Sequence, residues 1–261
     1  MSGAREPVRP TPREVVELGL AVDGSAALSD LYDAANLLGV ADQTLRLAIR
    51  RLVDAGLAEQ TGRGRAGTLR STGRARRRAL LDEAYWEFAV RQDDGAVVWD
   101  GHWHLLAFTV PESQRAQRDH LRDALSRLGA APLAPGLFVS PHDLRPALEA
   151  ESDGAVGRYL TTAVAPRVER GGQPIADLVG TLWPLDVLID AYAALHATLD
   201  HWAGSAAGGD PVRALAGRTA VLAALERAIG TDPLLPPELL PADWPGRTAR
   251  HRIRRDWLGQ S

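Results

Sequence analysis

Two short amphipathic stretches near the N-terminus constrain the fold of this chain most strongly. Apolar residues recur at helical spacing from about Ser29 to Gly39, and again from about Asp42 to Gly56. Each stretch ends at a glycine, which tolerates the positive φ found just after a helix, and Asp42 can cap the first amides of the second stretch. Two short helices with a glycine-bearing turn between them are typical of a helix-turn-helix, which we therefore predict here.

The second of these helices carries an unusual outer face. When its apolar stripe is turned inward, the side chains left outside are Gln43, Thr44, Arg46, Leu47 and Arg50. Residues four apart are neighbours on a helix, so the two arginines share a face. Amide and hydroxyl groups at the start of such a helix can reach base edges in the major groove of DNA, and arginines can reach guanine or phosphate. The pattern predicts a DNA-recognition helix.

A glycine- and arginine-rich segment follows this helix. Leu57–Gln60 and Thr68–Arg70 favour two short strands, and Gly62–Gly67 favours a flexible tip between them. Such a hairpin would be a wing, and its Arg63 and Arg65 could reach a phosphate backbone or an adjacent minor groove. The segment lacks the Gly-Lys-Ser/Thr ending of a phosphate-cradling nucleotide loop. We also assign Arg70 and Arg74, which follow the tip, to the DNA-binding surface.

Charge supports the same assignment. Every basic side chain in the sequence other than histidine is an arginine. Ten arginines stand between Arg46 and Arg78 against two acids, Asp54 and Glu59, so this stretch carries +8 and the rest of the chain −11. A basic block in an acidic protein indicates a local anionic partner, although it is also compatible with a solvated arginine-rich surface. Arg51 either joins the basic face or pairs with Asp54.

The remainder of the chain predicts an α+β segment followed by helices. Trp99–Val110 and Leu133–Ser140 favour strands on either side of a helix over about 113–129, and a further apolar run spans 159–168. Helices are then expected from Pro184 to Trp202 and over about 211–229. The boundaries we predict are 1–92, 93–172 and 173–261. A proline-rich run, Asp232–Gly246, is too rich in proline for a helix or central strand, and its leucines indicate packing against another element.

The sequence contains no cysteine, which rules out disulfides and thiolate metal sites. Its first residues lack the apolar run of a signal peptide, and no apolar stretch reaches the roughly 18 residues of a membrane span. A cytoplasmic protein without a membrane partner is expected.

Several segments together resemble the PaaX family of bacterial repressors of phenylacetic acid catabolism. The segments are, in chain order, Trp99–Leu106 with Phe108–Glu112, Leu133–Pro141, Leu182–Leu185 with Tyr192, and Asp232–Pro236 with Asp243–Gly246. The resemblance spans nearly the whole chain, and its specificity lies in the ordered set rather than in any one segment.

This resemblance implies three parts: an N-terminal winged helix-turn-helix, a middle ferredoxin-like domain similar to Cas2, and a helical C-terminal domain. It also implies a homodimer that binds a palindromic double-stranded operator and is released by an aryl acyl-CoA such as phenylacetyl-CoA, with no cofactor. Arg46 and Arg51 occupy the arginine positions of the family's third helix. Two departures leave the inducer open: Ala223–Arg227 lacks the family's histidine, and Pro184 replaces its usual aspartate.

Aromatic residues supply the candidates for inducer binding. Trp99, Trp103 and Trp183 could hold an aryl group, and Arg158 could hold CoA phosphates. Tryptophans in such numbers are more often core or interface packing.

Two other functions stay open as alternatives to a non-enzymatic regulator. A metal-dependent nuclease of the Cas2 type would want an aspartate at the end of its first strand, where this sequence has Phe108–Glu112. His102 and His104 could begin a metal site but are more often ordinary surface residues, so we predict neither catalysis nor a metal. A protein-binding adaptor is the second alternative, and a flat salt dependence of its DNA affinity would mark it.

Overall fold

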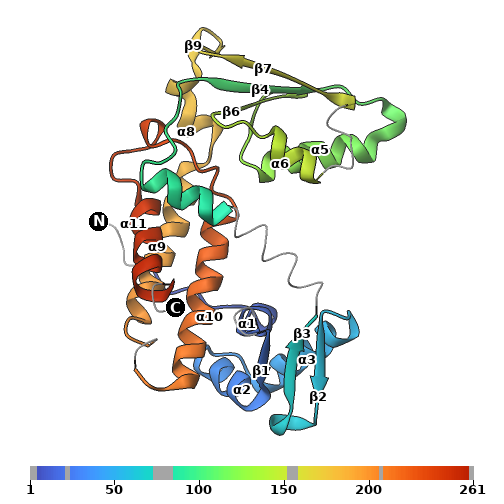
Figure 1. The fold of residues 1–261 in the computed structure, drawn as a ribbon, viewed down its shortest axis with the longest axis vertical. Coiled ribbons are helices and arrows are strands. Elements are labelled where there is room, and N and C mark those ends of the chain that lie inside the picture. Colours follow the sequence, from blue (N-terminus) through green and yellow to red (C-terminus); the bar gives the residue numbers. More distant parts are fainter. Residues whose placement is uncertain (1–4, 21–23, 73–84, 152–157, 206–207, 259–261) are drawn as a thin grey trace. The chain divides into compact units, whose positions relative to one another are not determined.

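The computed structural model describes residues 5–20, 24–72, 85–151, 158–205 and 208–258. These residues form two compact units, each assembled from separate stretches of chain (Figure 1). Unit 1 comprises Met1–Val90, Ile189–Ile229 and Pro245–Ser261, and unit 2 comprises Arg91–Leu188 and Gly230–Trp244. The three consecutive domains stay a prediction, and the packing units cut across them.

The N-terminal part of unit 1 alternates helices with a small antiparallel sheet. Its elements are α1 (Pro12–Gly19), β1 (Ser25–Ala27), α2 (Leu28–Leu37), α3 (Asp42–Asp54), β2 (Ala58–Thr61), the 3-10 turn η1 (Gly64–Ala66) and β3 (Thr68–Ser71). The strand order is β1-β3-β2, so the last strand lies between the other two. Both helices of the predicted pair and the predicted hairpin are present.

Local capping explains where these helices begin and end. The Glu14 N–H donates to the Thr11 hydroxyl at 3.3 Å and the Thr11 N–H donates to the Glu14 carboxylate at 2.6 Å, a capping box that starts α1. Gly39 and Gly56 follow α2 and α3 with φ of 76° and 67°, as predicted. The predicted cap of α3 is wrong: Ala41 occupies the N-cap, and the Asp42 carboxylate instead accepts a hydrogen bond from the Asn36 amide at 3.1 Å.

The core of unit 1 joins the two ends of the chain. Val15, Leu31 and Leu45 from the first three helices are fully buried in one cluster with Ala216 and Ala220 of α10. The C-terminal helices of this unit are α9 (Leu185–His201, whose first turn belongs to unit 2), α10 (Pro211–Ile229), α11 (Pro245–Ile253) and the π-helical turn η5 (Arg254–Leu258). Helices from opposite ends of the sequence therefore share one hydrophobic interior.

The segment before α1 also belongs to this interior. The Val8 N–H donates to the Thr198 hydroxyl of α9 at 2.8 Å, and Arg227 of α10 pairs with Glu14 at 2.9 Å. The polar sequence with Pro7 and Pro10 predicts a frayed tail over residues 1–10. In the described part of it, Val8 instead contacts α9, and the Arg9 carbonyl accepts a hydrogen bond from Arg227 of α10 at 3.2 Å.

Unit 2 is built around a four-stranded antiparallel sheet. Its elements are β4 (Trp103–Phe108), the 3-10 turn η2 (Glu112–Gln114), α5 (Arg115–Arg127), β5 (Ala131–Ala134), β6 (Leu137–Ser140), α6 (Arg145–Glu151), β7 (Leu160–Ala165), the hairpin of β8 (Glu169–Arg170) and β9 (Gln173–Pro174), η3 (Ile175–Leu178), α8 (Val179–Leu182) and η4 (Pro237–Leu239). Residues 85–93, which include the point in the sequence where the chain passes from unit 1 to unit 2, are helical. The order β5-β6-β4-β7 places the first and third strands in the centre, the ferredoxin-like arrangement that the resemblance implies.

One predicted strand is two strands. The run from Leu133 to Ser140 was expected to be continuous, but Gly136, with φ of 75°, turns the chain and folds it into the β5–β6 hairpin. The first strand also begins later than expected, at Trp103 rather than Trp99.

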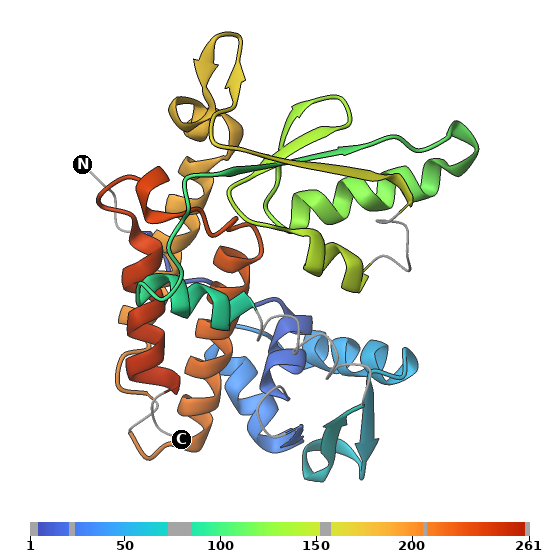
Figure 2. The same ribbon diagram turned by 45° about the horizontal axis from the view of Figure 1, so that its top comes forward.

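The two faces of this sheet carry separate cores. Helices α5 and α6 lie on one face, where Leu106 and Phe138 pack against Leu121 and Leu148 (Figures 1 and 2). Trp103 belongs to a second cluster with residues of η3 and α8. Alternating strand residues therefore point into different hydrophobic interiors, as a pleated strand requires.

The proline-rich run packs against other elements, as predicted, and its residues up to Trp244 belong to unit 2. The buried Leu234 has φ of 51°, and its N–H donates to the Asp232 carboxylate at 2.8 Å. Its carbonyl accepts a hydrogen bond from His142 Nε2 at 2.7 Å, and the neighbouring Leu235 carbonyl accepts one from the Gln92 amide at 3.1 Å. This segment is held by its backbone as well as by its leucines.

No single helix within the described residues is long and apolar enough to cross a membrane. Ile175–Leu182 and Leu185–His201 reach that length and composition only as a pair bent by 58°.

Candidate nucleic-acid interface

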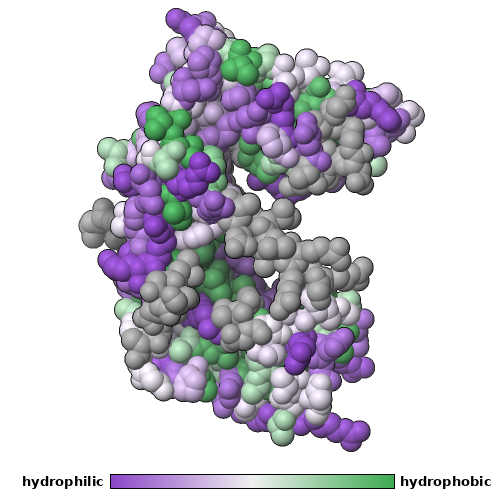
Figure 3. Space-filling view, viewed as in Figure 1, coloured by the Kyte–Doolittle hydropathy of each residue, from purple (hydrophilic) through white to green (hydrophobic). Residues whose placement is uncertain are grey.

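Helix α3 presents the face that the sequence predicts. Leu45, Ala48, Ile49 and Leu52 are buried in the core of unit 1. The residues left exposed on the rest of the helix are Gln43, Thr44, Arg46, Leu47, Arg50, Arg51 and Asp54. Leu47 is 49% exposed, a large apolar side chain in a polar and basic surrounding. Figure 3 shows purple hydrophilic side chains mixed with paler ones over the end of unit 1 where the hairpin lies.

The arginines of this face are weakly engaged within the protein. Arg50 and Asp54 form an ion pair of 3.8 Å in which both side chains are at least 70% exposed, a geometry that contributes little to stability. Asp54 therefore pairs with Arg50 rather than with Arg51, the partner that the sequence had suggested. Within the part of the chain that the structure describes, Arg46 and Arg51 form no ion pair and can meet an external anion.

The β2–β3 hairpin is more rigidly held than its glycine content suggests. Its tip folds into η1, and the Leu28 N–H at the start of α2 donates to the Gly67 carbonyl at 2.9 Å. A Cβ on Gly67 would lie 2.8 Å from the Thr61 carbonyl oxygen, so the two sides of the hairpin approach at a distance that only glycine permits. The flexible tip that we expected is thus a turn bonded to α2.

The predicted hairpin arginines differ in their surroundings. Arg63 and Arg70 are exposed, the first just before η1 and the second on the central strand, opposite Glu59 and Ser25. Arg74 lies outside the described residues.

Arg65 has partners that the sequence did not reveal. Its guanidinium pairs with Asp33 of α2 and, at 3.2 Å, with Asp42 of α3, and lies 5.3 Å from the centre of the Tyr32 ring. Hydrogen bonding from Arg65 holds the pKa of Asp42 below its ordinary value. Asp33 was not singled out by any pattern and Asp42 was predicted only as a helix cap, so the sequence did not predict this cluster.

The three tryptophans predicted for a ligand site do come together in unit 2. Trp99 and Trp103 meet edge to face with ring centroids 5.2 Å apart, and Trp103 stacks on Trp183 at 6.3 Å. Trp103 and Trp183 are buried with aliphatic neighbours, and the Trp183 indole N–H donates to the Gly129 carbonyl at 2.8 Å. This arrangement is that of a packed core, the alternative that sequence reasoning favoured.

Arg158 does not join these tryptophans. It is exposed, with its guanidinium 6.0 Å from the centre of the Tyr159 ring, just before β7. The register of β7 on β4 pairs Leu160 with Phe108 and Ala165 with Trp103. Arg158 therefore lies at the end of the strand pair opposite to Trp103, so these residues do not form one pocket.

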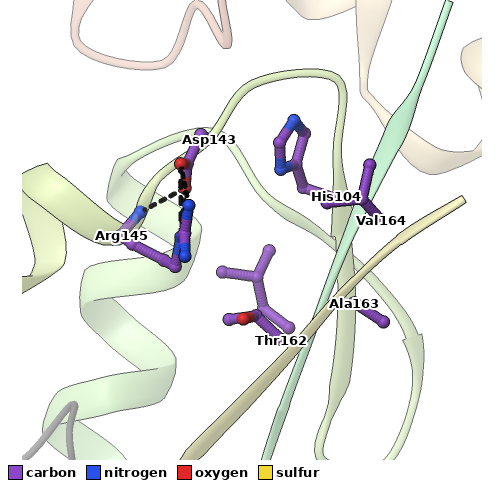
Figure 4. Close-up of a pocket in the computed structure, with 7 residues that line it drawn as sticks. His104, Asp143, Arg145, Thr162, Ala163 and Val164 are labelled. Atoms are coloured by element: carbon purple, nitrogen blue, oxygen red, sulfur yellow. Dashed lines mark hydrogen bonds and ion pairs between the residues drawn. The ribbon is translucent and has the colours of Figure 1, made fainter.

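A small hollow lies elsewhere in unit 2, beside β4 and β7 (Figure 4). It measures about 130 Å³ and is lined by His104, Leu106, Asp143, Arg145, Thr162, Ala163 and Val164. Arg145 donates to the Asp143 carboxylate at 2.6 Å and lowers its pKa to about 2. Because sites for drug-sized ligands measure roughly 300–1,000 Å³, this hollow cannot enclose an acyl-CoA.

The two candidate metal-binding histidines have different surroundings. His104 borders the hollow, whereas His102 lies before β4 with its N–H bonded to the Asp100 carboxylate at 2.9 Å. Among the described residues, no group of three or more His, Asp or Glu side chains could hold a metal ion.

Two parts of the chain match models of known protein families. Residues 96–174 match the PaaX protein central Cas2-like domain, and residues 183–256 match the PaaX-like protein C-terminal domain. The chain belongs to the PaaX family. The four-stranded sheet of unit 2 is therefore the Cas2-like central domain of a PaaX protein, and the helices that follow are its C-terminal domain.

A solved structure is similar over nearly the whole chain. The "Uncharacterized protein Rv0674 from Mycobacterium tuberculosis" is 30% identical, with 94% of this chain and 93% of that chain covered and a TM-score of 0.56. No curated protein matches the sequence.

Proposed function

We propose that this PaaX-family protein is a DNA-binding transcriptional regulator that reads double-stranded operator DNA with α3. The observation that carries the proposal is the face of α3, where Arg46, Arg50 and Arg51 are exposed while the opposite stripe is buried. A helix with polar groups in its first turn and arginines along one face fits the major groove, where arginine recognises guanine or phosphate.

We further propose that residues 1–92 form a winged helix-turn-helix. Its support is the order α1-β1-α2-α3-β2-β3, with the hairpin directly after the recognition helix. In this proposal Arg63 on the tip and Arg70 on β3 contact phosphates, as does Arg74, while Gln43 and Thr44 reach base edges.

The oligomeric state, the inducer and the direction of regulation rest on family membership. We propose a cytoplasmic, non-enzymatic homodimer that represses an aromatic-catabolism operon and is released by an aryl acyl-CoA such as phenylacetyl-CoA. Trp99, Trp103, Trp183 and Arg158 were the predicted contacts of this inducer. The separation of Arg158 from the three packed tryptophans favours testing release of DNA directly over testing these residues one by one.

The test is a salt titration of binding to the DNA upstream of the protein's own gene, measured by fluorescence anisotropy. Each lost phosphate contact reduces the slope of log affinity against log salt by about 0.9. We expect weaker binding for Arg46→Ala and for Arg50→Ala, and a smaller slope for each arginine that contacts a phosphate. Addition of phenylacetyl-CoA tests release, and intact DNA in the presence of Mg²⁺ distinguishes a regulator from a nuclease.

Arg115→Ala is the matched control for Arg50→Ala. Arg115 is 74% exposed on α5 and forms an i,i+4 ion pair of 3.8 Å with Asp119, as Arg50 is 79% exposed and pairs with Asp54 at the same distance. Equal effects of the Arg50 and Arg115 substitutions, or no binding by the wild type at low salt, would contradict the proposal.

A further inference from the structure

We propose that Arg65 is a positioning residue that fixes the hairpin tip to the recognition helix, and that Arg63 is the phosphate-contacting arginine of this tip. This inference rests on the proposed DNA-binding function and assigns different roles to two arginines that sequence reasoning treated alike.

The partners of Arg65 come from two different helices. One guanidinium nitrogen, Nη1, pairs with Asp33 of α2, and the other, Nη2, pairs with Asp42 in the first turn of α3 at 3.2 Å. The planar fork of an arginine can bridge two carboxylates in this way, whereas the ammonium of a lysine is a single point charge. Arg65 thus connects the tip to both helices of the pair.

The backbone of the tip is also anchored to α2. The Leu28 N–H donates to the Gly67 carbonyl at 2.9 Å, and the Gly67 N–H donates to the Gly64 carbonyl at 3.2 Å within η1. The Tyr32 ring lies beside the Arg65 guanidinium. Side-chain and backbone contacts therefore converge on one position of the tip relative to α2 and α3.

Electrostatics disfavours transfer of Arg65 to a phosphate. Asp33 and Asp42 are about half exposed, and Asp42 begins the helix whose arginines are proposed to meet DNA. A phosphate drawn to Arg65 would meet the same two carboxylates. Arg63 forms no ion pair within the described residues and has no such competitor.

Salt titration separates the two roles. Arg63→Ala should lower the slope of log affinity against log salt by about 0.9, because a phosphate contact is lost. Arg65→Ala should weaken binding with the slope unchanged, because the number of phosphate contacts stays the same. A slope loss for Arg65→Ala equal to that for Arg63→Ala would overturn the inference.

Lysine substitutions provide the second readout. Lys restores a simple phosphate contact but cannot bridge Asp33 and Asp42, so we expect Arg63→Lys to bind like the wild type and Arg65→Lys to bind like Arg65→Ala. Circular dichroism checks that each variant is folded. Full recovery by Arg65→Lys refutes the positioning role while leaving the proposed function intact. Absence of DNA binding by the wild-type protein would refute both the positioning role and the proposed function.

Discussion

Gly129→Ala tests whether the Asp232–Pro236 segment is fixed to the central domain by close packing. Gly129 follows α5 with φ of 84°, and a Cβ placed on it would lie 2.7 Å from both Cα and Cβ of Pro233. Alanine in this left-handed conformation costs roughly 1–2 kcal/mol. The clash of the new Cβ with Pro233 adds about 1–3 kcal/mol to this loss, the usual cost of overpacking. The cost is not avoided by a small shift, because both sides are backbone or ring atoms that move little.

Gly95→Ala is the control that separates the cost of crowding Pro233 from the cost of the left-handed conformation. Gly95 also ends a helix, with φ of 74°, and nothing lies within 4 Å of its added Cβ. Both glycines close a turn of the same type. The Gly95 N–H donates to the Gln92 carbonyl and the Gly129 N–H donates to the Ser126 carbonyl, each at 3.1 Å. The Gly95 variant should therefore lose only the conformational cost of about 1–2 kcal/mol.

The free energy of unfolding can be measured by urea titration, followed by tryptophan fluorescence, because Trp103 and Trp183 lie in the core that Leu235 also joins. We expect a loss of about 2–5 kcal/mol for Gly129→Ala, the sum of the two terms. Equal losses for the two variants would refute the reasoning, because they would show that Pro233 does not crowd Gly129.

Three further predictions concern the recognition helix, pH and capping. The exposed Leu47 can contact thymine methyl groups, so replacing thymine by uracil in the DNA should weaken binding by the wild type and leave binding by Leu47→Ala unchanged. An equal loss of affinity in both proteins would contradict this contact. Burial lowers the pKa of His142, so below about pH 6.5 the unfolded chain takes up a proton that the folded chain does not. Stability should therefore fall as the pH decreases from about 7.5 to about 5.5, and this fall should be smaller in His142→Asn, as urea midpoints would show. Thr11→Ala removes one half of the α1 capping box and should lower the free energy of unfolding by about 1 kcal/mol, whereas an unchanged melting temperature would show that the cap contributes nothing.

Sequence patterns predicted the elements of the candidate interface because those patterns are local. The apolar stripe of α3 dictates which side is buried, and its arginines follow on the opposite side from helical geometry alone. Gly39 and Gly56 marked helix ends for the same reason, since a positive φ is a property of the residue itself. The order of segments along the chain carried the family resemblance.

Contacts between distant segments were beyond such patterns. The chain path brings α10 against α1 and α2, so residues from both ends of the sequence pack in one unit. Arg65 looked like every other arginine of the basic stretch until folding placed Asp33 and Asp42 beside it. Local periodicity specifies the face that a helix exposes, whereas the partner of a charged side chain depends on loop paths and core packing that no short stretch of sequence contains.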